Sequence, residues 1–259
     1  MLKKRIIPTL LWKNLGLVKG KNFNSWRRVG AVLPNLKIYN SRDVDELFLL
    51  DISATIENRE PDEFSIKSFS SECIVPFCVG GGIKKISQIE YLLSSGADKV
   101  CINSEAYKNP NFIKEAVKVF GSQCIVISID YKTVGDKKKC FSHSGKNTVD
   151  RNPIEWAMEM EQIGCGEILF TSIDLDGTMQ GYDLNYIEKL KDKINIPIIA
   201  GGGAGKLEDF YNLLNIEKVS GSAAASIFHF TEITPKMVKN FLISKDIKMR
   251  DMFADSKNI

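Results

Sequence analysis

The chain has 259 residues, of which 44% are hydrophobic and 26% charged, and its 35 basic and 32 acidic side chains give a net charge of +3. These values are typical of a globular protein. A chain of this length buries a sufficient core without a disulfide or a metal staple. The near balance of charge excludes a dedicated nucleic-acid surface as the first hypothesis.

Metal and membrane functions also find little support. The six cysteines contain no Cys-x-x-Cys pair and only two histidines accompany them, so we expect no metal site and no cofactor. The apolar stretch that follows the basic N-terminus is interrupted by Pro8 and Lys13, which makes it too short for a signal peptide or a membrane span. We therefore expect a cytoplasmic protein.

Short apolar segments alternate with amphipathic ones along the chain. We predict eight strands, at residues 5–11, 47–51, 75–79, 99–103, 124–130, 167–172, 196–200 and 218–224. Helical patterns lie between them, for example at 86–95 and 154–163. The strands are continuously apolar, which is typical of a parallel sheet covered on both faces.

The sequence also resembles itself at an offset of 121 positions. This offset pairs Glu46 with Glu167 and the triplet Gly80–Gly82 with Gly201–Gly203. Two similar four-stranded halves that close on each other predict an α/β fold of the (β/α)8 or TIM-barrel type.

The repeat also predicts the domain organisation. We expect a single barrel domain over residues 1–259, built from half-barrels at roughly 1–121 and 122–245, with a C-terminal tail at 246–259.

The two glycine turns are candidate phosphate sites. Each follows a strand and precedes a helix, so that backbone N–H groups and the helix N-terminus can approach an anion. A tight turn without a ligand is the alternative for one copy, but two copies favour a ligand with two phosphate groups. The predicted phosphate- or substrate-binding residues are Gly81, Gly82, Asn103, Ser104, Thr171, Asp176, Gly177, Gly202, Gly203, Ala225 and Ser226.

Three further residues are candidates for the chemistry. Asp130 ends an apolar strand, where partial desolvation suits a carboxyl group to acid–base catalysis, although it could equally cap the next segment. Asp51 has the same two interpretations. Lys19 lies in a Gly- and Lys-rich stretch at 16–22 that we expect to be a flexible lid over a phosphate, with a plain surface lysine as the alternative.

Four charged residues, Arg5, Glu46, Lys99 and Glu167, occupy strand starts. Surface ion pairs are the usual explanation for such residues. Their even spacing around a barrel instead predicts a charged gate over an internal passage.

Several segments are similar to one known family. They are Lys4-Arg5-Ile6-Ile7-Pro8, Asp45-Glu46-Leu47, Val79-Gly80-Gly81-Gly82-Ile83, Gly96-Ala97-Asp98-Lys99-Val100, Gly166-Glu167-Ile168-Leu169, Thr171-Ser172-Ile173-Asp174, Asp176-Gly177-Thr178 and Ala200-Gly201-Gly202-Gly203-Ala204-Gly205-Lys206. With them the chain resembles, over nearly its whole length, the cyclase subunit of imidazole glycerol phosphate synthase.

The resemblance implies a partner and a substrate. In that family a glutaminase subunit docks on the bottom of the barrel, at positions that include Asp98 and Gln123 here, and its ammonia crosses the charged ring. The glycine turns hold a bis-phosphorylated nucleotide. Two aspartates, at the ends of the first and fifth strands, perform cyclisation and cleavage, and the second of them corresponds to Asp130.

The first of these aspartates is replaced by Leu11, and the loss of one of two acid–base groups removes a factor of about 10² to 10⁴ in rate. The segment 25–32 lacks the family's Gly-Asp-Pro, and Gly201 stands where a serine is usual. These departures resemble a divergent branch, associated with bacterial surface polysaccharides, that passes ammonia to a sugar-amidating enzyme.

We favour such an ammonia conduit. The alternatives are a working histidine-pathway cyclase, in which Asp51 or a water replaces the lost acid, and a scaffold that does not conduct ammonia.

Overall fold

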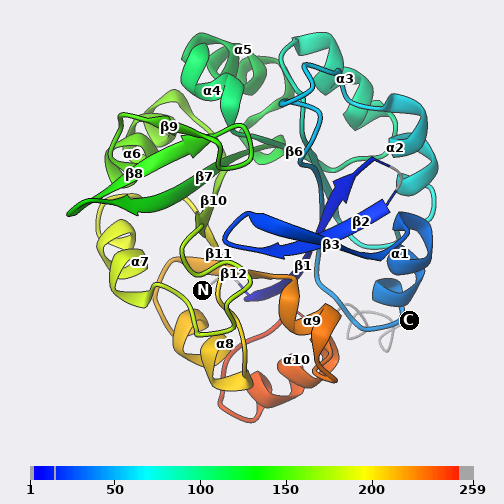
Figure 1. Ribbon diagram of the computed structural model, residues 1–259, viewed down its shortest axis with the longest axis vertical. Coiled ribbons are helices and arrows are strands. Elements are labelled where there is room, and N and C mark those ends of the chain that lie inside the picture. Colours follow the sequence, from blue (N-terminus) through cyan, green and yellow to red (C-terminus); the bar gives the residue numbers. More distant parts are fainter. Residues whose placement is uncertain (1–2, 15, 251–259) are drawn as a thin grey trace.

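The computed structural model describes residues 3–14 and 16–250, and it has the predicted (β/α)8 architecture (Figure 1). Eight parallel strands form a closed barrel, because β12 pairs with β1 and β10 pairs with β7. In spatial order these strands are β1 (Arg5–Lys13), β4 (Leu47–Asp51), β5 (Phe77–Gly80), β6 (Lys99–Ile102), β7 (Ile125–Val134), β10 (Glu167–Ser172), β11 (Ile198–Gly201) and β12 (Val219–Ala224).

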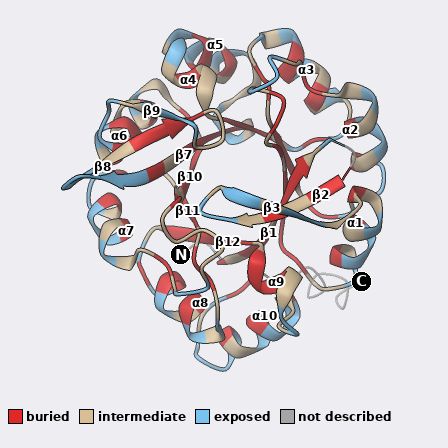
Figure 2. Ribbon diagram, in the orientation of Figure 1, coloured by how far each residue is buried: buried red, intermediate tan, exposed pale blue. Residues whose placement is uncertain are grey.

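Helices surround the barrel and bury their inner faces against it, while their outer faces remain exposed (Figure 2). They are α1 (Val32–Asn40), α2 (Glu63–Ser70), α3 (Ile86–Ser94), α4 (Ser104–Lys108), α5 (Pro110–Phe120), the short 3₁₀ helix η1 (Ser122–Cys124), α6 (Pro153–Ile163), α7 (Leu184–Lys191), α8 (Leu207–Leu214), α9 (Ser226–Phe230) and α10 (Pro235–Ile243). None of the described helices is both long and apolar enough to cross a membrane.

The core has two parts because successive side chains of a strand point to opposite faces. Ile6 and Leu10 of β1 pack outward, with the helices, whereas Ile7 between them points into the bore. There it belongs to an inner apolar layer formed by Ile7, Phe48, Cys78, Cys101, Val126, Leu169, Ile199 and Ala223. This layer fills the middle of the barrel and separates its two ends.

Two hairpins that the sequence did not predict extend the barrel at one end. The first consists of β2 (Gly16–Lys21) and β3 (Asn24–Gly30), and the second consists of β8 (Lys137–Ser142) and β9 (Asn147–Val149). Strands β1 and β7 run beyond the barrel and fold back into antiparallel partners. The stretch predicted as a flexible lid, 16–22, forms strand β2 over Gly16–Lys21 and pairs with β1 and β3, and its flexibility stays a prediction.

The two ends of the described chain meet at the other end of the barrel. Lys4 N donates to Lys248 O at 2.9 Å, and Arg250 N donates to Lys4 O at 3.1 Å. Residues 251–259 of the predicted tail lie outside the described residues. The single-domain organisation and its two half-barrels remain a proposal.

Candidate functional site

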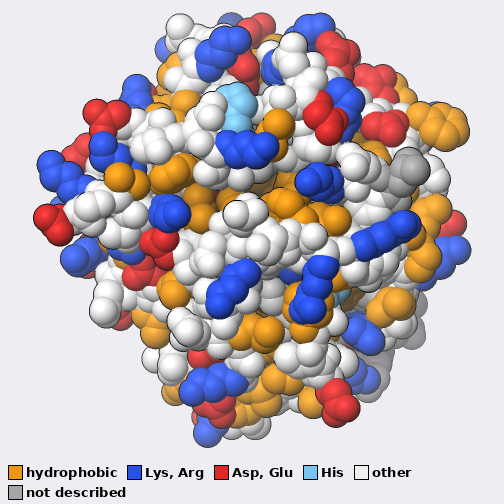
Figure 3. Space-filling model, in the orientation of Figure 1, with side chains coloured by type: hydrophobic (Ala, Val, Ile, Leu, Met, Phe, Trp, Pro, Cys, Tyr) orange, Lys and Arg blue, Asp and Glu red, His pale blue; other side chains and the backbone are white. Residues whose placement is uncertain are grey.

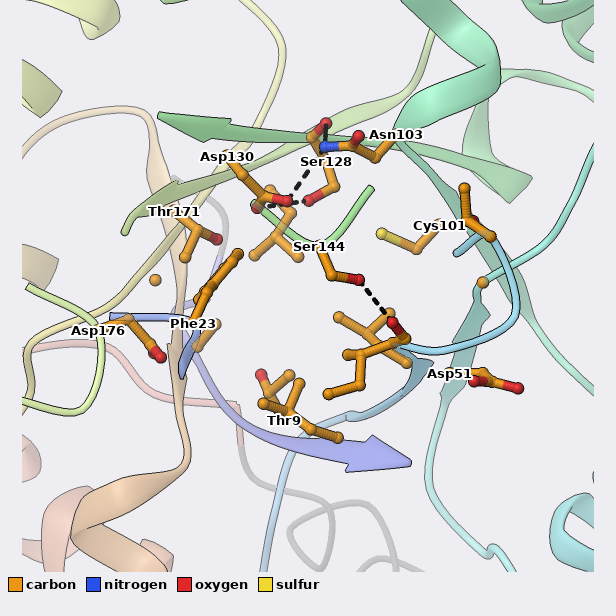
Figure 4. A pocket seen from close by; sticks show the side chains of 18 of the residues that line it. Thr9, Phe23, Asp51, Cys101, Asn103, Ser128, Asp130, Ser144, Thr171 and Asp176 are labelled. Atoms are coloured by element: carbon orange, nitrogen blue, oxygen red, sulfur yellow. Dashed lines mark hydrogen bonds between the residues drawn. The ribbon is translucent and has the colours of Figure 1, made fainter. Parts of the chain in front are cut away.

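A pocket of about 290 Å³ opens where the barrel strands end, beneath the β2–β3 hairpin (Figure 4). It is lined by residues from all eight barrel strands or the loops that follow them. The pocket brings together every residue predicted for catalysis or phosphate binding, namely Leu11, Lys19, Asp51, Gly81, Gly82, Asn103, Ser104, Asp130, Thr171, Asp176, Gly177, Gly202, Gly203, Ala225 and Ser226.

Asp130 is the carboxyl group most suited to proton transfer. It sits on β7 where the strand leaves the barrel, and its carboxylate accepts hydrogen bonds from Asn103 Nδ2 at 3.1 Å and Ser128 Oγ at 3.2 Å. Burial raises the pKa of Asp130 to about 7, the hydrogen bond from Ser128 opposes that rise, and the negative charge of Asp176 adds to it. A carboxyl group with a pKa near neutrality can both donate and accept a proton.

Asp51 caps the segment that follows its strand, which is the second of the two roles predicted for it. Its Oδ1 accepts hydrogen bonds from Ser53 N at 2.9 Å and Ala54 N at 3.0 Å, and its Oδ2 lies 3.1 Å from an Arg59 guanidinium nitrogen. In Figure 4 its side chain points away from the centre of the pocket. These contacts cap the turn after β4, so the structure does not support Asp51 as a substitute acid.

Lys19 is buried, so the alternative of a plain surface lysine was wrong. Its side chain is 1% exposed, and its Nζ forms an ion pair with Asp176 Oδ2 at 2.5 Å. Asn22 N, at the end of the same hairpin, donates to Asp176 O at 2.8 Å. A Cβ on Gly177 would lie 2.3 Å from Gly20 O, so glycine is required there for the hairpin to approach. Asp176 and Gly177 therefore hold the β2–β3 hairpin over the pocket.

The two glycine turns have matching surroundings. Gly81 and Gly202 both have left-handed backbones, with φ of 113° and 89°. A Cβ would lie 2.3 Å from Asp51 O in the first turn and 2.5 Å from Ser172 O in the second, and these contacts are themselves 121 residues apart. Only glycine fits this conformation and spacing without strain. Both turns line the pocket.

The polar side chains beside these turns differ in whether they already have hydrogen-bond partners within the protein. Asn103 Nδ2 donates to Ser128 O at 3.1 Å as well as to Asp130, so it braces the pocket wall. Ser104 Oγ accepts a hydrogen bond from His143 N at 3.0 Å. Ser226 is 5% exposed and its hydroxyl has no partner among the described residues. A buried hydroxyl without a partner is costly, which favours a ligand at this position.

The charged ring lies at the opposite end of the bore. Arg5 forms ion pairs with Glu46, at 2.5 Å, and with Glu167. Lys99 Nζ lies 2.9 Å from a carboxylate oxygen of each of the same two glutamates. Burial alone would raise the pKa of Glu167, but the charges of Arg5 and Lys99 lower it. The four predicted residues therefore form one closed, charged ring beneath the apolar layer.

No group of His, Cys, Asp and Glu side chains suited to a metal ion occurs in the described part of the chain.

Comparison with known proteins agrees with this geometry. A family model described as histidine biosynthesis protein matches residues 5–234. The chain belongs to the HisF-like family of histidine biosynthesis proteins. It is 43% identical to the imidazole glycerol phosphate synthase subunit HisF of Dehalococcoides mccartyi strain BAV1, over 96% of this chain and 99% of that protein. It is 42% identical to the same subunit of Chloroherpeton thalassium, over 96% of this chain and all of that protein.

Leu11, where the resemblance predicts a catalytic aspartate, lies in the pocket of this HisF-like chain. It is 9% exposed and lines the pocket from the part of β1 that pairs with β2. Leu11 carries no group that transfers a proton. Thr9, two residues earlier on the same strand, points its hydroxyl into the pocket in Figure 4, and this buried oxygen has no partner among the described residues.

The predicted docking positions of the HisF-like chain lie at the ring end. Asp98 and Gln123 are both exposed, just before the starts of β6 and β7. Asp98 also accepts a hydrogen bond from Phe77 N at 2.8 Å, which fixes its side chain. The structure therefore places both residues on the same face as the entrance to the charged ring.

Sequence reasoning missed the residues that roof the pocket. Phe23, at the tip of the β2–β3 hairpin, projects into the pocket, and Ser144 Oγ reaches across it to donate to Ile52 O at 2.7 Å (Figure 4). Phe23 and Ser144 have φ of 56° and 55°, a left-handed conformation that is rare for such residues. Strain of this kind accumulates at functional sites. The sequence carries no glycine at these positions that would have revealed the turns.

Proposed function

We propose that this chain is the synthase subunit of a glutamine-dependent amidotransferase. It binds a ligand with two phosphate groups in the pocket and accepts ammonia, through the charged ring, from a glutaminase subunit docked at Asp98 and Gln123. One observation carries the proposal, which is that the ring, the apolar layer and the pocket with Asp130 follow one another along a single bore.

The binding of a bis-phosphorylated ligand rests on the two glycine turns. They are related by the internal repeat, lie in one pocket and have equivalent backbone conformations around Gly81 and Gly202. Ser226 supports the second site, because its buried hydroxyl lacks a partner within the described structure. Backbone N–H groups at such turns bind phosphate oxygens without a bulky side chain in the way.

The transfer of ammonia rests on the layer above the ring. Ile7, Phe48 and Val126 are fully buried and apolar. Transfer of an ammonium ion through such a layer would cost far more free energy than transfer of neutral ammonia. The bore therefore favours the neutral nucleophile, and the four ring residues are the gate that it passes.

The choice between an ammonia conduit and a working cyclase depends on Leu11. In the position where the resembled family has a catalytic aspartate, this chain supplies no proton-transfer group, and Asp51 is committed to Arg59 and its own turn. We infer that the chain passes ammonia on to a second enzyme, of the kind that amidates sugars of bacterial surface polysaccharides.

A second candidate is supported by Asp130. Because its pKa is near 7, this residue remains equipped for acid–base catalysis. The candidate is a working imidazole glycerol phosphate synthase subunit, as the relatives are named, and the matching family model is described as a histidine biosynthesis protein. The two candidates differ in whether the pocket itself forms an imidazole product.

The decisive experiment is turnover of the bis-phosphorylated nucleotide with saturating ammonium at alkaline pH. We expect wild type to bind the nucleotide and to stimulate its glutaminase, but to turn over at least about 100-fold more slowly than Leu11→Asp. Adding Asp130→Asn to Leu11→Asp is expected to abolish the gain, which ties it to the pair of carboxyl groups.

Each other outcome has a clear meaning. Wild-type turnover at an ordinary enzyme rate would replace the conduit with the histidine-pathway enzyme. Failure of wild type both to bind the nucleotide and to stimulate a glutaminase would contradict the whole proposal. The remaining hypothesis would then be a scaffold that does not conduct ammonia.

A further inference from the structure

The β2–β3 hairpin, which covers the mouth of the pocket, carries basic side chains and no acidic ones. The first 42 residues contain ten Lys and Arg residues and neither Asp nor Glu, although the whole chain has a net charge of only +3. Three of these cations, Lys21, Arg27 and Arg28, are exposed on the hairpin. Figure 3 shows Lys and Arg side chains around the centre of this face, with Asp and Glu mostly toward its edge.

These three cations do not face the ligand. The pocket is lined by Lys19, Phe23 and Trp26 of the hairpin, but not by Lys21, Arg27 or Arg28. Arg27 instead stacks on the ring of Phe230 at 3.6 Å, outside the pocket. None of the three forms an ion pair with any residue of the described structure. Their charges are therefore available to a partner that approaches from outside.

The same hairpin has an open edge. Strand β3 pairs only with β2 among the described strands, so its second edge presents unpaired backbone groups. Natural proteins usually protect such an edge, and an extended segment of a partner can add to it. Arg27 and Arg28, both exposed on β3, belong to a residue type that contributes strongly to protein interfaces.

We propose that the hairpin surface formed by Lys21, Arg27 and Arg28 docks an acidic face of the enzyme that consumes the ammonia. The inference rests on the proposed conduit function. Ammonia that leaves the pocket for water becomes protonated and loses its nucleophilic lone pair. An acceptor seated on the hairpin stands beside the pocket, at the end of the barrel opposite the face proposed for the glutaminase.

The position of the partner is tested by photo-crosslinking. A benzophenone amino acid replaces Arg28 in the full chain, which is irradiated with its glutaminase in cells of the source organism. The matched control replaces Lys132, an exposed residue on the β7–β8 hairpin. We expect an adduct at position 28 but not at position 132. The crosslinked protein, when purified and reconstituted with the complex, should consume glutamine-derived ammonia.

The charge requirement is tested by calorimetry with that purified protein. We expect Arg27→Glu combined with Arg28→Glu to raise Kd at least about tenfold, and neutral Arg27→Gln with Arg28→Gln to raise it less. The control reversal, Lys132→Glu with Lys137→Glu, is expected to change Kd less than twofold. Added NaCl should weaken wild-type binding because the contact is electrostatic.

Two outcomes overturn the docking proposal. One is the absence of an adduct at position 28, or adducts there only with the glutaminase, a second copy of this chain or a protein that does not use ammonia. The other is a charge reversal that leaves Kd within twofold of wild type. Nucleotide binding and glutaminase stimulation are measured in the same samples, and their loss in wild type would instead refute the conduit function.

Discussion

Replacing Asp130 with asparagine removes its ionisable group but preserves much of its packing. The substitution therefore isolates the free-energy cost of burying the charge. The native carboxyl group has a pKa raised from 3.8 to about 7, mainly by burial. A group whose pKa is higher in the folded state favours folding while protonated. Its contribution is complete below the unfolded pKa and disappears as pH rises toward the folded value. Asparagine keeps an oxygen that accepts hydrogen bonds but never ionises.

The magnitude follows from the linkage between protonation and folding. At pH 8 both states of wild type are mostly ionised, and a pKa of about 7 in the folded state against 3.8 in the unfolded state costs the folded state about 4 kcal/mol. At pH 5.5 the folded state remains protonated while the unfolded state ionises, and the cost is about 2 kcal/mol. The stability gained by Asp130→Asn should therefore grow by about 2 kcal/mol between these pH values.

Urea unfolding of wild type and Asp130→Asn, measured from pH 5.5 to pH 8, checks this difference. The variant also changes hydrogen bonds to Asn103 and Ser128, but those contributions do not follow the titration of a carboxyl group. A difference in unfolding free energy that is constant over this range would refute the raised pKa. So would a difference that falls as pH increases.

Two further predictions concern the backbone and the ring. Gly81→Ala and Gly202→Ala should each lower the free energy of unfolding by at least about 3 kcal/mol, because left-handed strain is joined by a contact of 2.3 or 2.5 Å with a carbonyl oxygen. Gly135→Ala is the control, since its φ is 60° but its Cβ would meet open space, and it should cost only about 1 kcal/mol; equal losses in urea unfolding would contradict the argument. Lys99→Met should cost about 3 kcal/mol because it leaves the ring glutamates with one cation. Adding Glu167→Gln should recover part of that loss, and a double variant no more stable than the single one would show that the ring is not a coupled unit.

The barrel could be predicted because its strands obey a simple physical rule. A parallel strand covered on both faces must be apolar throughout, so segments such as 47–51 and 167–172 stand out in the sequence, and both have those bounds in the structure. The internal repeat further predicted that these strands close into a barrel. Strands β2 and β8 escaped prediction because glycines and lysines dominate them, and their pairing depends on the extension of β1 and β7.

The residues that line the pocket were predictable for a similar reason. In a (β/α)8 barrel the residues that end the strands converge on one face, so the position in sequence sufficed for Asp130 and for the glycine turns. The partners of these residues were not predictable. Asp51 ends β4 and Asp130 lies where β7 leaves the barrel. Arg59 and a neighbouring turn engage Asp51, whereas burial raises the pKa of Asp130 to about 7. That difference depends on loops and contacts that no strand pattern encodes.

Leu11 and the cationic hairpin belong to one structural unit. Leu11 lies on the extension of β1, where it pairs with Val18 of β2, so it forms the base of the hairpin that covers the pocket. Leu11, which carries no proton-transfer group, is thus joined by backbone pairing to the surface that carries Arg27 and Arg28. A chain that had merely lost its own catalysis would have no need of an unpaired basic surface over the pocket mouth. One that hands ammonia to another enzyme needs both features at the same place, which is why Leu11→Asp and the Arg27→Glu, Arg28→Glu pair should have separable effects: the first on turnover in the pocket, the second on the acceptor alone.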